Sequence, residues 1–89
     1  MIKLVQVIQA NQNSEYYLRD VSINAAHIVS INPSDKFIML LHQDKLPDGL
    51  DQSHEFVEIS LLNGKTIIAV GSSQIINEKI KTAKKLLLG

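Results

Sequence analysis

Short segments with apolar residues at every second position alternate with clusters of turn-forming residues, a pattern typical of β-strands joined by turns. Residues 1–9 follow it with a phase slip at Val5, which predicts either a strand with a bulge or a strand buried on both faces. Residues 16–24 are rich in aromatic and β-branched side chains and predict a second strand. The turn formers at 11–14 join these segments, so we expect a hairpin.

The middle of the chain carries its longest apolar run. Residues 28–31 predict a short strand, and Pro33 favours a turn over residues 32–35. Residues 36–42 are almost continuously apolar and only about as long as a strand, so they predict the most buried strand. Residues 43–53 are polar and acidic, and we expect them to form a loop.

The last third of the chain predicts a second hairpin. Segments 55–62 and 65–70 have strand patterns, and the Asn63-Gly64 pair between them favours a two-residue type I′ turn. That turn fixes the register and places apolar or β-branched side chains on one core face. The predicted pairs are Leu62 with Lys65, Leu61 with Thr66, Ile59 with Ile68, and Val57 with Val70.

Residues 72–88 predict an amphipathic helix, and Ser72 or Ser73 can cap its N-terminus. Apolar residues spaced by whole turns form one stripe. The stripe consists of Ile76, Ile80, Ala83 and Leu87. The lysines that fall away from it are the candidate interaction surface of the chain. They are Lys81, Lys84 and Lys85.

Together these elements predict an α+β fold that is mostly β. We expect a five- to six-stranded antiparallel sheet or small open barrel with one C-terminal helix. The 89 residues fit a single domain over 1–89. Because the chain has no cysteine, neither disulfides nor thiolate metal sites can contribute, and its stability must come from packing.

Charge is balanced overall but separated along the sequence. Nine Lys and Arg residues match nine Asp and Glu residues, so the net charge is 0. Residues 44–58 hold five carboxylates against Lys45, a net charge of −4, whereas residues 59–89 hold five lysines against Glu78, a net charge of +4. We expect these two segments to attract each other, within one chain or between two.

No targeting segment is recognised in the sequence, since Gln6 and Gln9 interrupt the apolar residues near its start. The longest unbroken apolar run, Phe37 to Leu41, is far shorter than the ~20 residues of a membrane span. We therefore expect a cytoplasmic protein without membrane contact.

The tripeptide Gly64-Lys65-Thr66 has the ending of a phosphate-binding P-loop, G-x-x-x-x-G-K-[ST]. Ile59 stands where that motif requires its first glycine, and a predicted strand follows where the motif needs a helix. Phosphate binding at this position is therefore not expected.

Metal chemistry has equally little support. The three histidines are His27, His42 and His54. They lie in separate segments without the spacing of metal ligands. In the acidic loop, Leu46 occupies a position where an EF-hand needs an oxygen ligand. We expect no metal, no cofactor and no enzymatic activity.

Two family resemblances run across these segments. The succession of YLRDVSIN, HIVSI, LPDGLD, HEF, AVGS and LLLG resembles small uncharacterised proteins of T4-like and marine phages, which implies a phage origin but no activity. The segments SINAAHIVSI and LLNGKTIIAVGSS are similar to the FlbD-type swarming-motility domain, a small β-rich unit that ends in a helix. The chain differs from that domain in a longer N-terminal hairpin and an acidic insertion at 44–54. Neither resemblance implies catalytic residues.

The sequence favours a non-enzymatic accessory or protein-interaction domain that self-associates, most simply as a two-fold dimer. Zero net charge removes long-range repulsion between copies, and an open sheet leaves edge strands unpaired. The second face of the last hairpin also carries Leu62, Ile67 and Ala69, more apolar surface than one helix covers.

The alternative is a nucleic-acid-binding accessory protein. Lys81, Lys84 and Lys85 would then contact a phosphate backbone. We favour it less because Arg19 is the only arginine, and arginine is the side chain best suited to reading bases.

Overall fold

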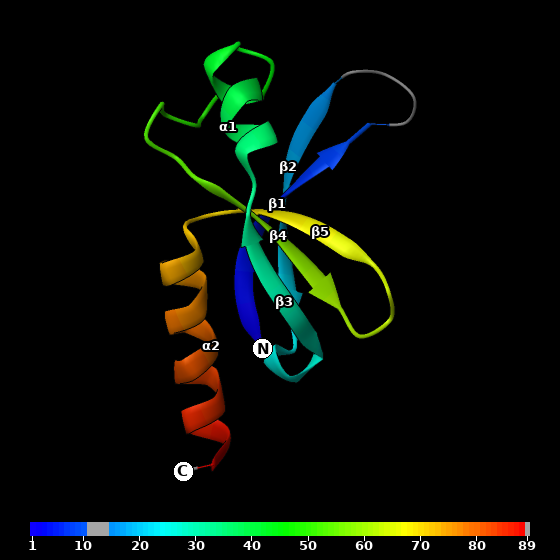
Figure 1. Ribbon diagram of the computed structural model, residues 1–89, viewed down its shortest axis with the longest axis vertical. Helices are drawn as coiled ribbons and strands as arrows, with labels where there is room; N and C mark the ends of the chain where they lie inside the picture. Colours follow the sequence, from blue (N-terminus) through cyan, green and yellow to red (C-terminus); the bar gives the residue numbers. More distant parts are fainter. Residues whose placement is uncertain (11–14, 89) are drawn as a thin grey trace.

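The computed structural model describes residues 1–10 and 15–88, with side chains as far as Lys85, so the predicted loop at 11–14 lies outside it. The described chain forms one open antiparallel sheet in the order β2-β1-β5-β4-β3, flanked by helices (Figure 1). The strands are β1 Ile2–Gln9, β2 Tyr16–Ile23, β3 Ile28–Pro33, β4 Phe56–Leu61 and β5 Thr66–Val70. The helices are the 3₁₀ turn η1 Ala25–His27, α1 Asp35–His42 and α2 Ser73–Leu88. The predicted α+β class is confirmed, with five strands in an open sheet.

The hairpin of β1 and β2 contains eight residue pairs and no bulge. At its start β1 buries Ile2 and Leu4 in one hydrophobic cluster, and further along it buries Val7 in another. Because successive side chains of a strand point to opposite faces, positions 4 and 7 lie on opposite faces of the sheet. The phase slip at Val5 therefore comes from a strand that is buried on both faces, which was the second of the two predicted alternatives.

Residues 62–65 connect β4 to β5, and because Leu61 bonds to Lys65 the loop itself has three residues, 62–64, in place of the predicted two-residue turn. The Gly64 N–H donates to the Leu61 carbonyl (3.0 Å), and the Leu61 N–H donates to the Lys65 carbonyl (2.8 Å). Gly64 has a φ of +84°, but Asn63 is not among the residues with positive φ. A type I′ turn needs positive φ at both central residues, so the loop is the longer type in which one glycine is left-handed.

The extra loop residue shifts the register of this hairpin by one. The predicted pairs Leu62–Lys65, Leu61–Thr66, Ile59–Ile68 and Val57–Val70 are wrong. The observed pairs are Ser60–Thr66, Ile59–Ile67, Glu58–Ile68, Val57–Ala69 and Phe56–Val70. A slip of one residue moves every side chain of a strand to the other face. Ala69 and Ile67 consequently join the core, and of the apolar surface predicted for this hairpin only Leu62 stays exposed.

The segment 36–42, predicted to be the most buried strand, is helical and forms most of α1, so that prediction is wrong. An apolar run this short does not distinguish a buried strand from a buried helix. The helix buries Phe37 and Leu41, one turn apart, and leaves Met39 60% exposed, whereas a strand would place all three on one face. The Phe37 ring packs edge-on against Tyr16, with centroids 5.5 Å apart, and lies 6.1 Å from the Phe56 ring.

Each face of the sheet carries its own hydrophobic cluster. The α2-side cluster consists of Ile2, Leu4, Ile23, Val57, Ile59, Ala69 and Ile76. The α1-side cluster consists of Val7, Phe37, Leu41, Leu46 and Phe56. Phe56 and Val57 are neighbours in β4 and belong to different clusters, so the clusters lie on opposite faces. The two helices therefore cover opposite faces of one sheet, α1 near one end and α2 towards the other (Figure 1).

The predicted stripe of α2 is confirmed for the residues whose side chains are described. Ile76 is buried, and Ile80 and Ala83 pack half-buried against the α2-side cluster. The side chain of Leu87, the fourth predicted member, lies outside the described residues.

Only one of the two serines predicted to cap α2 makes a capping hydrogen bond in the described structure. The Ile75 N–H donates to Ser72 Oγ (3.2 Å), so Ser72 is the capping residue. Ser73 Oγ is buried without a hydrogen-bond partner in the described structure.

Candidate interaction surface

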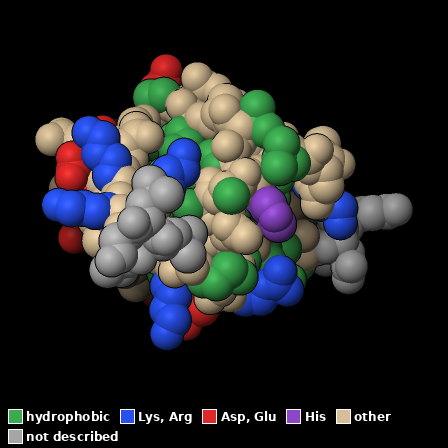
Figure 2. Space-filling view, turned by 90° about the horizontal axis from the view of Figure 1, so that it is seen from below, with side chains coloured by type: hydrophobic (Ala, Val, Ile, Leu, Met, Phe, Trp, Pro, Cys, Tyr) green, Lys and Arg blue, Asp and Glu red, His purple; other side chains and the backbone are tan. Residues whose placement is uncertain are grey.

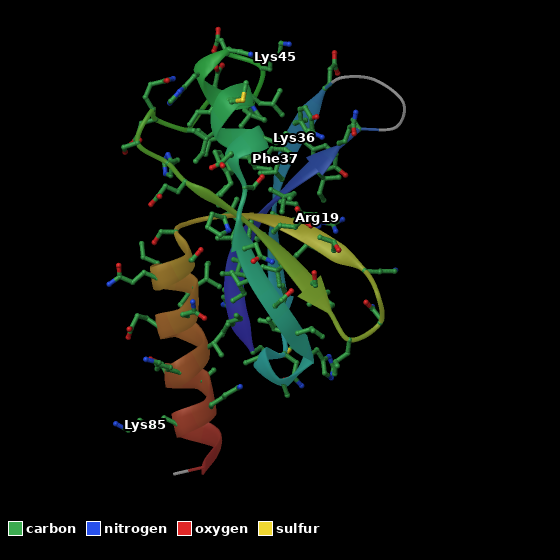
Figure 3. The ribbon with its side chains drawn as sticks, viewed as in Figure 1. Arg19, Lys36, Phe37, Lys45 and Lys85 are labelled. Atoms are coloured by element: carbon green, nitrogen blue, oxygen red, sulfur yellow. The ribbon has the colours of Figure 1, made fainter. Side chains whose placement is uncertain are left out.

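Three of the four lysines of α2 make up the predicted interaction surface. At about 100° per residue, Lys81 and Lys85 lie nearly opposite Ile76. Lys81, Lys84 and Lys85 are all exposed, and no ion pair to them occurs within the described residues. Figure 3 shows Lys85 near the end of α2, pointing away from the sheet. The three predicted residues therefore form one exposed basic surface.

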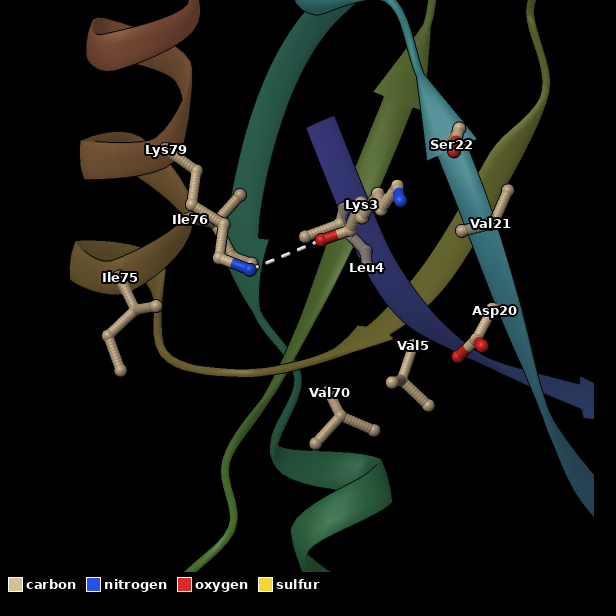
Figure 4. A pocket seen from close by; sticks show the side chains of 10 residues that line it. All are labelled: Lys3, Leu4, Val5, Asp20, Val21, Ser22, Val70, Ile75, Ile76 and Lys79. Carbon is tan, nitrogen blue, oxygen red and sulfur yellow. Dashed lines mark hydrogen bonds between the residues drawn. The ribbon is translucent and has the colours of Figure 1, made fainter. Parts of the chain in front are cut away.

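Lys79 behaves differently from these three lysines. Its ammonium group donates to the Lys3 carbonyl of β1 at 3.1 Å (Figure 4). β1 pairs with β5 only at Gln6 and Val7, so the first half of β1 has no strand on that side. Lys79 thus satisfies a carbonyl that a neighbouring strand would otherwise bind.

The acidic segment, which we define as residues 44–58, connects α1 to β4 and includes the first strand residues of β4. Leu46 is buried in the α1-side cluster and Leu50 packs against it, so apolar anchors hold the segment at the α1 end. The carboxylates point to solvent. They are Asp44, Asp48, Asp51, Glu55 and Glu58, and each is exposed.

Within this segment Asp51 organises a local turn. Its carboxylate accepts hydrogen bonds from the Ser53 hydroxyl and from the Ser53 N–H (2.9 Å). These two bonds, with a smaller contribution from the charge of His54 at 3.4 Å, hold the pKa of Asp51 below its usual value. The pair of His54 and Asp51 is the only ion pair found among the described residues.

The two charged surfaces lie in different parts of an elongated molecule. The chain measures 43 Å along its longest axis, with the acidic segment beside α1 and the lysines on the second half of α2 (Figures 1 and 3). The Debye length is about 8 Å at physiological ionic strength, so separated exposed charges interact weakly within one copy. No ion pair joins the two surfaces among the described residues. The predicted attraction within one chain is therefore not supported by a direct contact.

An apolar groove opens at the end of the sheet that lies towards the C-terminal end of α2 (Figure 1). It has a volume of about 700 Å³ and lies between the end of β2 and the β4–β5 loop. Its lining includes Met1, Ile23, Leu61, Leu62 and Ile67. Met1 is 78% exposed and Leu62 67% exposed. Figure 2 looks onto this end and shows hydrophobic side chains gathered on both sides of a histidine.

A second groove of about 430 Å³ lies between β1 and α2 (Figure 4). Val5, Val70 and Ile75 line it, together with Lys3 and Lys79. Ile75 is 55% exposed. Sequence reasoning missed both grooves because each depends on how distant strands pair, and the only local signals are apolar residues outside the predicted core faces.

The histidines stay apart in the fold, as their spacing suggests. His27 lies in η1, His42 ends α1, and His54 belongs to the acidic segment. Among the described residues no group of three or more His, Cys, Asp or Glu side chains is placed to hold a metal ion.

Comparisons of the chain with protein-family models, with curated protein sequences and with solved structures find no match. The two family resemblances therefore stay predictions. In the part of the chain that the structure describes, no helix combines the length and the apolar character needed to cross a membrane. Function is consequently inferred from the geometry of the described residues.

Proposed function

We propose that the protein is a non-enzymatic interaction module that works as a homodimer. One observation carries this proposal: a chain of zero net charge presents two exposed surfaces of opposite sign, with no ion pair between them among the described residues. Neutral overall charge leaves no long-range repulsion between copies, while the separated charges attract at close range. The exposed apolar grooves supply further surface that a protein partner could cover.

The non-enzymatic part of the proposal is supported by the scatter of reactive side chains. The three histidines lie in separate elements, and the two grooves are lined mainly by aliphatic side chains. His54 does lie beside Asp51 and Ser53, but this group belongs to an exposed turn and lines neither groove. General acid–base or nucleophilic catalysis needs such groups within hydrogen-bond reach of one another in a cleft. A cytoplasmic location and a phage origin belong to the same proposal and rest on the sequence alone.

Light scattering at micromolar concentration tests self-association. We expect a species of twice the 9.9 kDa chain mass that dissociates on dilution and in 1 M salt, where the Debye length falls to about 3 Å. A single species of the chain mass, unchanged over a tenfold concentration range, would refute the homodimer.

A second candidate is nucleic-acid binding through the exposed lysines of α2. The observation in its favour is that Lys81, Lys84 and Lys85 have no carboxylate partner in the described structure. Retention on double-stranded DNA or heparin that weakens steeply with salt, and that is lost with Lys81→Glu and Lys85→Glu, would support it. Retention that these substitutions do not change would exclude the lysine surface as the binding site.

A further inference from the structure

We infer that two copies associate antiparallel, so that the exposed lysines of α2 in each copy contact the acidic segment of the other. This inference rests on the proposed homodimer and names its contact surface. The surface, which we call the charged flank, joins the acidic segment to the outer face of α2.

The two halves of the charged flank adjoin at the start of α2. Gly71, just before α2, donates its N–H to the carbonyl of Glu55 at 2.7 Å, which ties the end of the acidic segment to the start of the helix. A shallow pocket of about 330 Å³ at this junction is lined by Glu55, Gln74 and Ile38, among others. From Gln74 the helix positions i+7 and i+11 carry Lys81 and Lys85, so these lysines lie on the same side of α2 as the junction.

The flank therefore carries carboxylates on one side of the junction and lysines on the other. Glu78 lies between Gln74 and Lys81 on the same side of the helix, and α2 as a whole holds four lysines against this one carboxylate, a net charge of +3. The acidic segment has a net charge of −4. One copy thus offers nearly equal amounts of both signs on one flank.

A two-fold axis near the junction pairs these charges twice. Rotation by half a turn sets the acidic segment of one copy against the lysines of its partner, and the same contact repeats by symmetry. A parallel arrangement would oppose like charges. A head-to-tail arrangement would leave one acidic and one basic surface unmatched at its ends and would continue into a polymer.

A second copy fits this flank better than a polymer of one charge. A polyanion could neutralise the lysines, but it would be repelled by the exposed carboxylates Asp44, Asp48, Asp51 and Glu55 of the acidic segment. A polycation would meet the opposite difficulty. An identical chain matches both halves of the flank at once.

Charge reversal on either half tests the arrangement. Lys81→Glu with Lys85→Glu reverses two charges of the basic half and changes the net charge of α2 from +3 to −1. Asp48→Lys with Glu55→Lys reverses two charges of the acidic half and changes its net charge from −4 to 0. Each double variant should raise the dimer dissociation constant about tenfold or more, because each exposed ion pair contributes a factor of roughly 1.4 to 5 and reversal makes it repulsive. Circular dichroism checks that each variant keeps the wild-type fold.

The decisive measurement mixes the two double variants. In the mixed dimer the substituted, now acidic, positions of one helix face the substituted, now basic, positions of the other copy's acidic segment. The unsubstituted helix and the unsubstituted acidic segment face each other, so the substituted positions no longer repel at either contact. We expect light scattering to recover a species of twice the chain mass. Failure of the mixture to dimerise, while the wild type does, would overturn the antiparallel contact and leave the homodimer standing.

A matched control removes the effect of net charge. Arg19→Glu with Lys65→Glu gives the same net charge of −4 as the lysine variant, but Arg19 lies in β2 and Lys65 directly before β5. It should dimerise like the wild type and should not rescue the Asp48→Lys, Glu55→Lys variant. Equal weakening by this control would refute the flank. A monomeric wild type would refute the homodimer together with it.

Discussion

The two ends of the molecule bury their apolar surface in different ways. The α1-side cluster is built on aromatic rings, Phe37 and Phe56 with Tyr16 beside them, and on a helix of eight residues. The α2-side cluster contains only aliphatic side chains, and among the described side chains of the sixteen-residue α2 only Ile76 is fully buried.

That difference separates structural roles from surface roles. A helix of two turns is not stable in water by itself. The burial of Phe37 and Leu41 therefore stabilises α1. α2 is twice as long and presents most of its surface to solvent, including all its lysines. Substitutions at the α1 end should therefore change stability, whereas substitutions on the outer face of α2 should change association.

The largest expected effect tests α1. Phe37→Ala should lower the free energy of unfolding by about 3–5 kcal/mol, since it leaves a cavity between Tyr16 and Phe56. Met39→Ala is the control. Because Met39 is exposed, its truncation should change the free energy of unfolding by less than about 0.5 kcal/mol. Urea unfolding followed by circular dichroism measures both. Equal losses would indicate a strand, in which positions 37 and 39 share a face.

A smaller loss is expected at the loop that sets which residues of β5 face each helix. Gly64→Val should cost about 1–2 kcal/mol, because a β-branched residue resists the φ of +84°. An added Cβ would meet no atom within 4 Å, so the cost comes from the backbone alone. Gly64→Asn, which tolerates a left-handed conformation, should recover most of the stability. Thermal melting decides, and a Val variant that melts like the wild type would contradict the left-handed Gly64.

The contrast between the ends also explains what sequence patterns could predict. α2 was predictable because its length repeats the helical period several times, and its stripe is unambiguous. α1 was not, since one apolar run of strand length fits both a buried strand and a buried helix. The final decision came from tertiary contacts with Tyr16 and Phe56, which no local pattern contains.

Register was the second limit of sequence reasoning. Asn63-Gly64 fits a two-residue turn and a three-residue loop equally well, and the choice moved Ala69 from an exposed face to full burial. The lysine surface, in contrast, was predictable as a set because exposed helix positions follow from the buried ones. The acidic segment was predictable as a loop, but its place at the α1 end depends on where Leu46 packs.

A still smaller effect compares two neighbouring serines at the start of α2. Ser72→Ala removes the oxygen that accepts from the Ile75 N–H, and it should cost about 1 kcal/mol. Ser73→Ala removes a buried hydroxyl that has no partner in the described structure, so it should be neutral or stabilising. Chemical unfolding of both variants measures the difference. The same loss in both would mean that Ser73, too, contributes a hydrogen bond.

The smallest expected effect lies in the acidic segment. Because the Ser53 hydroxyl is the main cause that lowers the pKa of Asp51, Ser53→Ala should raise this pKa towards its usual value. A lowered pKa means that the folded state holds the proton less tightly than the unfolded state. The resulting stabilisation is therefore present above about pH 4 and is lost as the pH falls through the folded pKa. Asp51 is exposed, so the change in stability is small and the pKa itself is the useful readout. NMR titration of the Asp51 carboxyl measures it, with Ser72→Ala as the control that should leave it unchanged. A pKa that does not move in Ser53→Ala would show that the hydroxyl bond is not formed in solution.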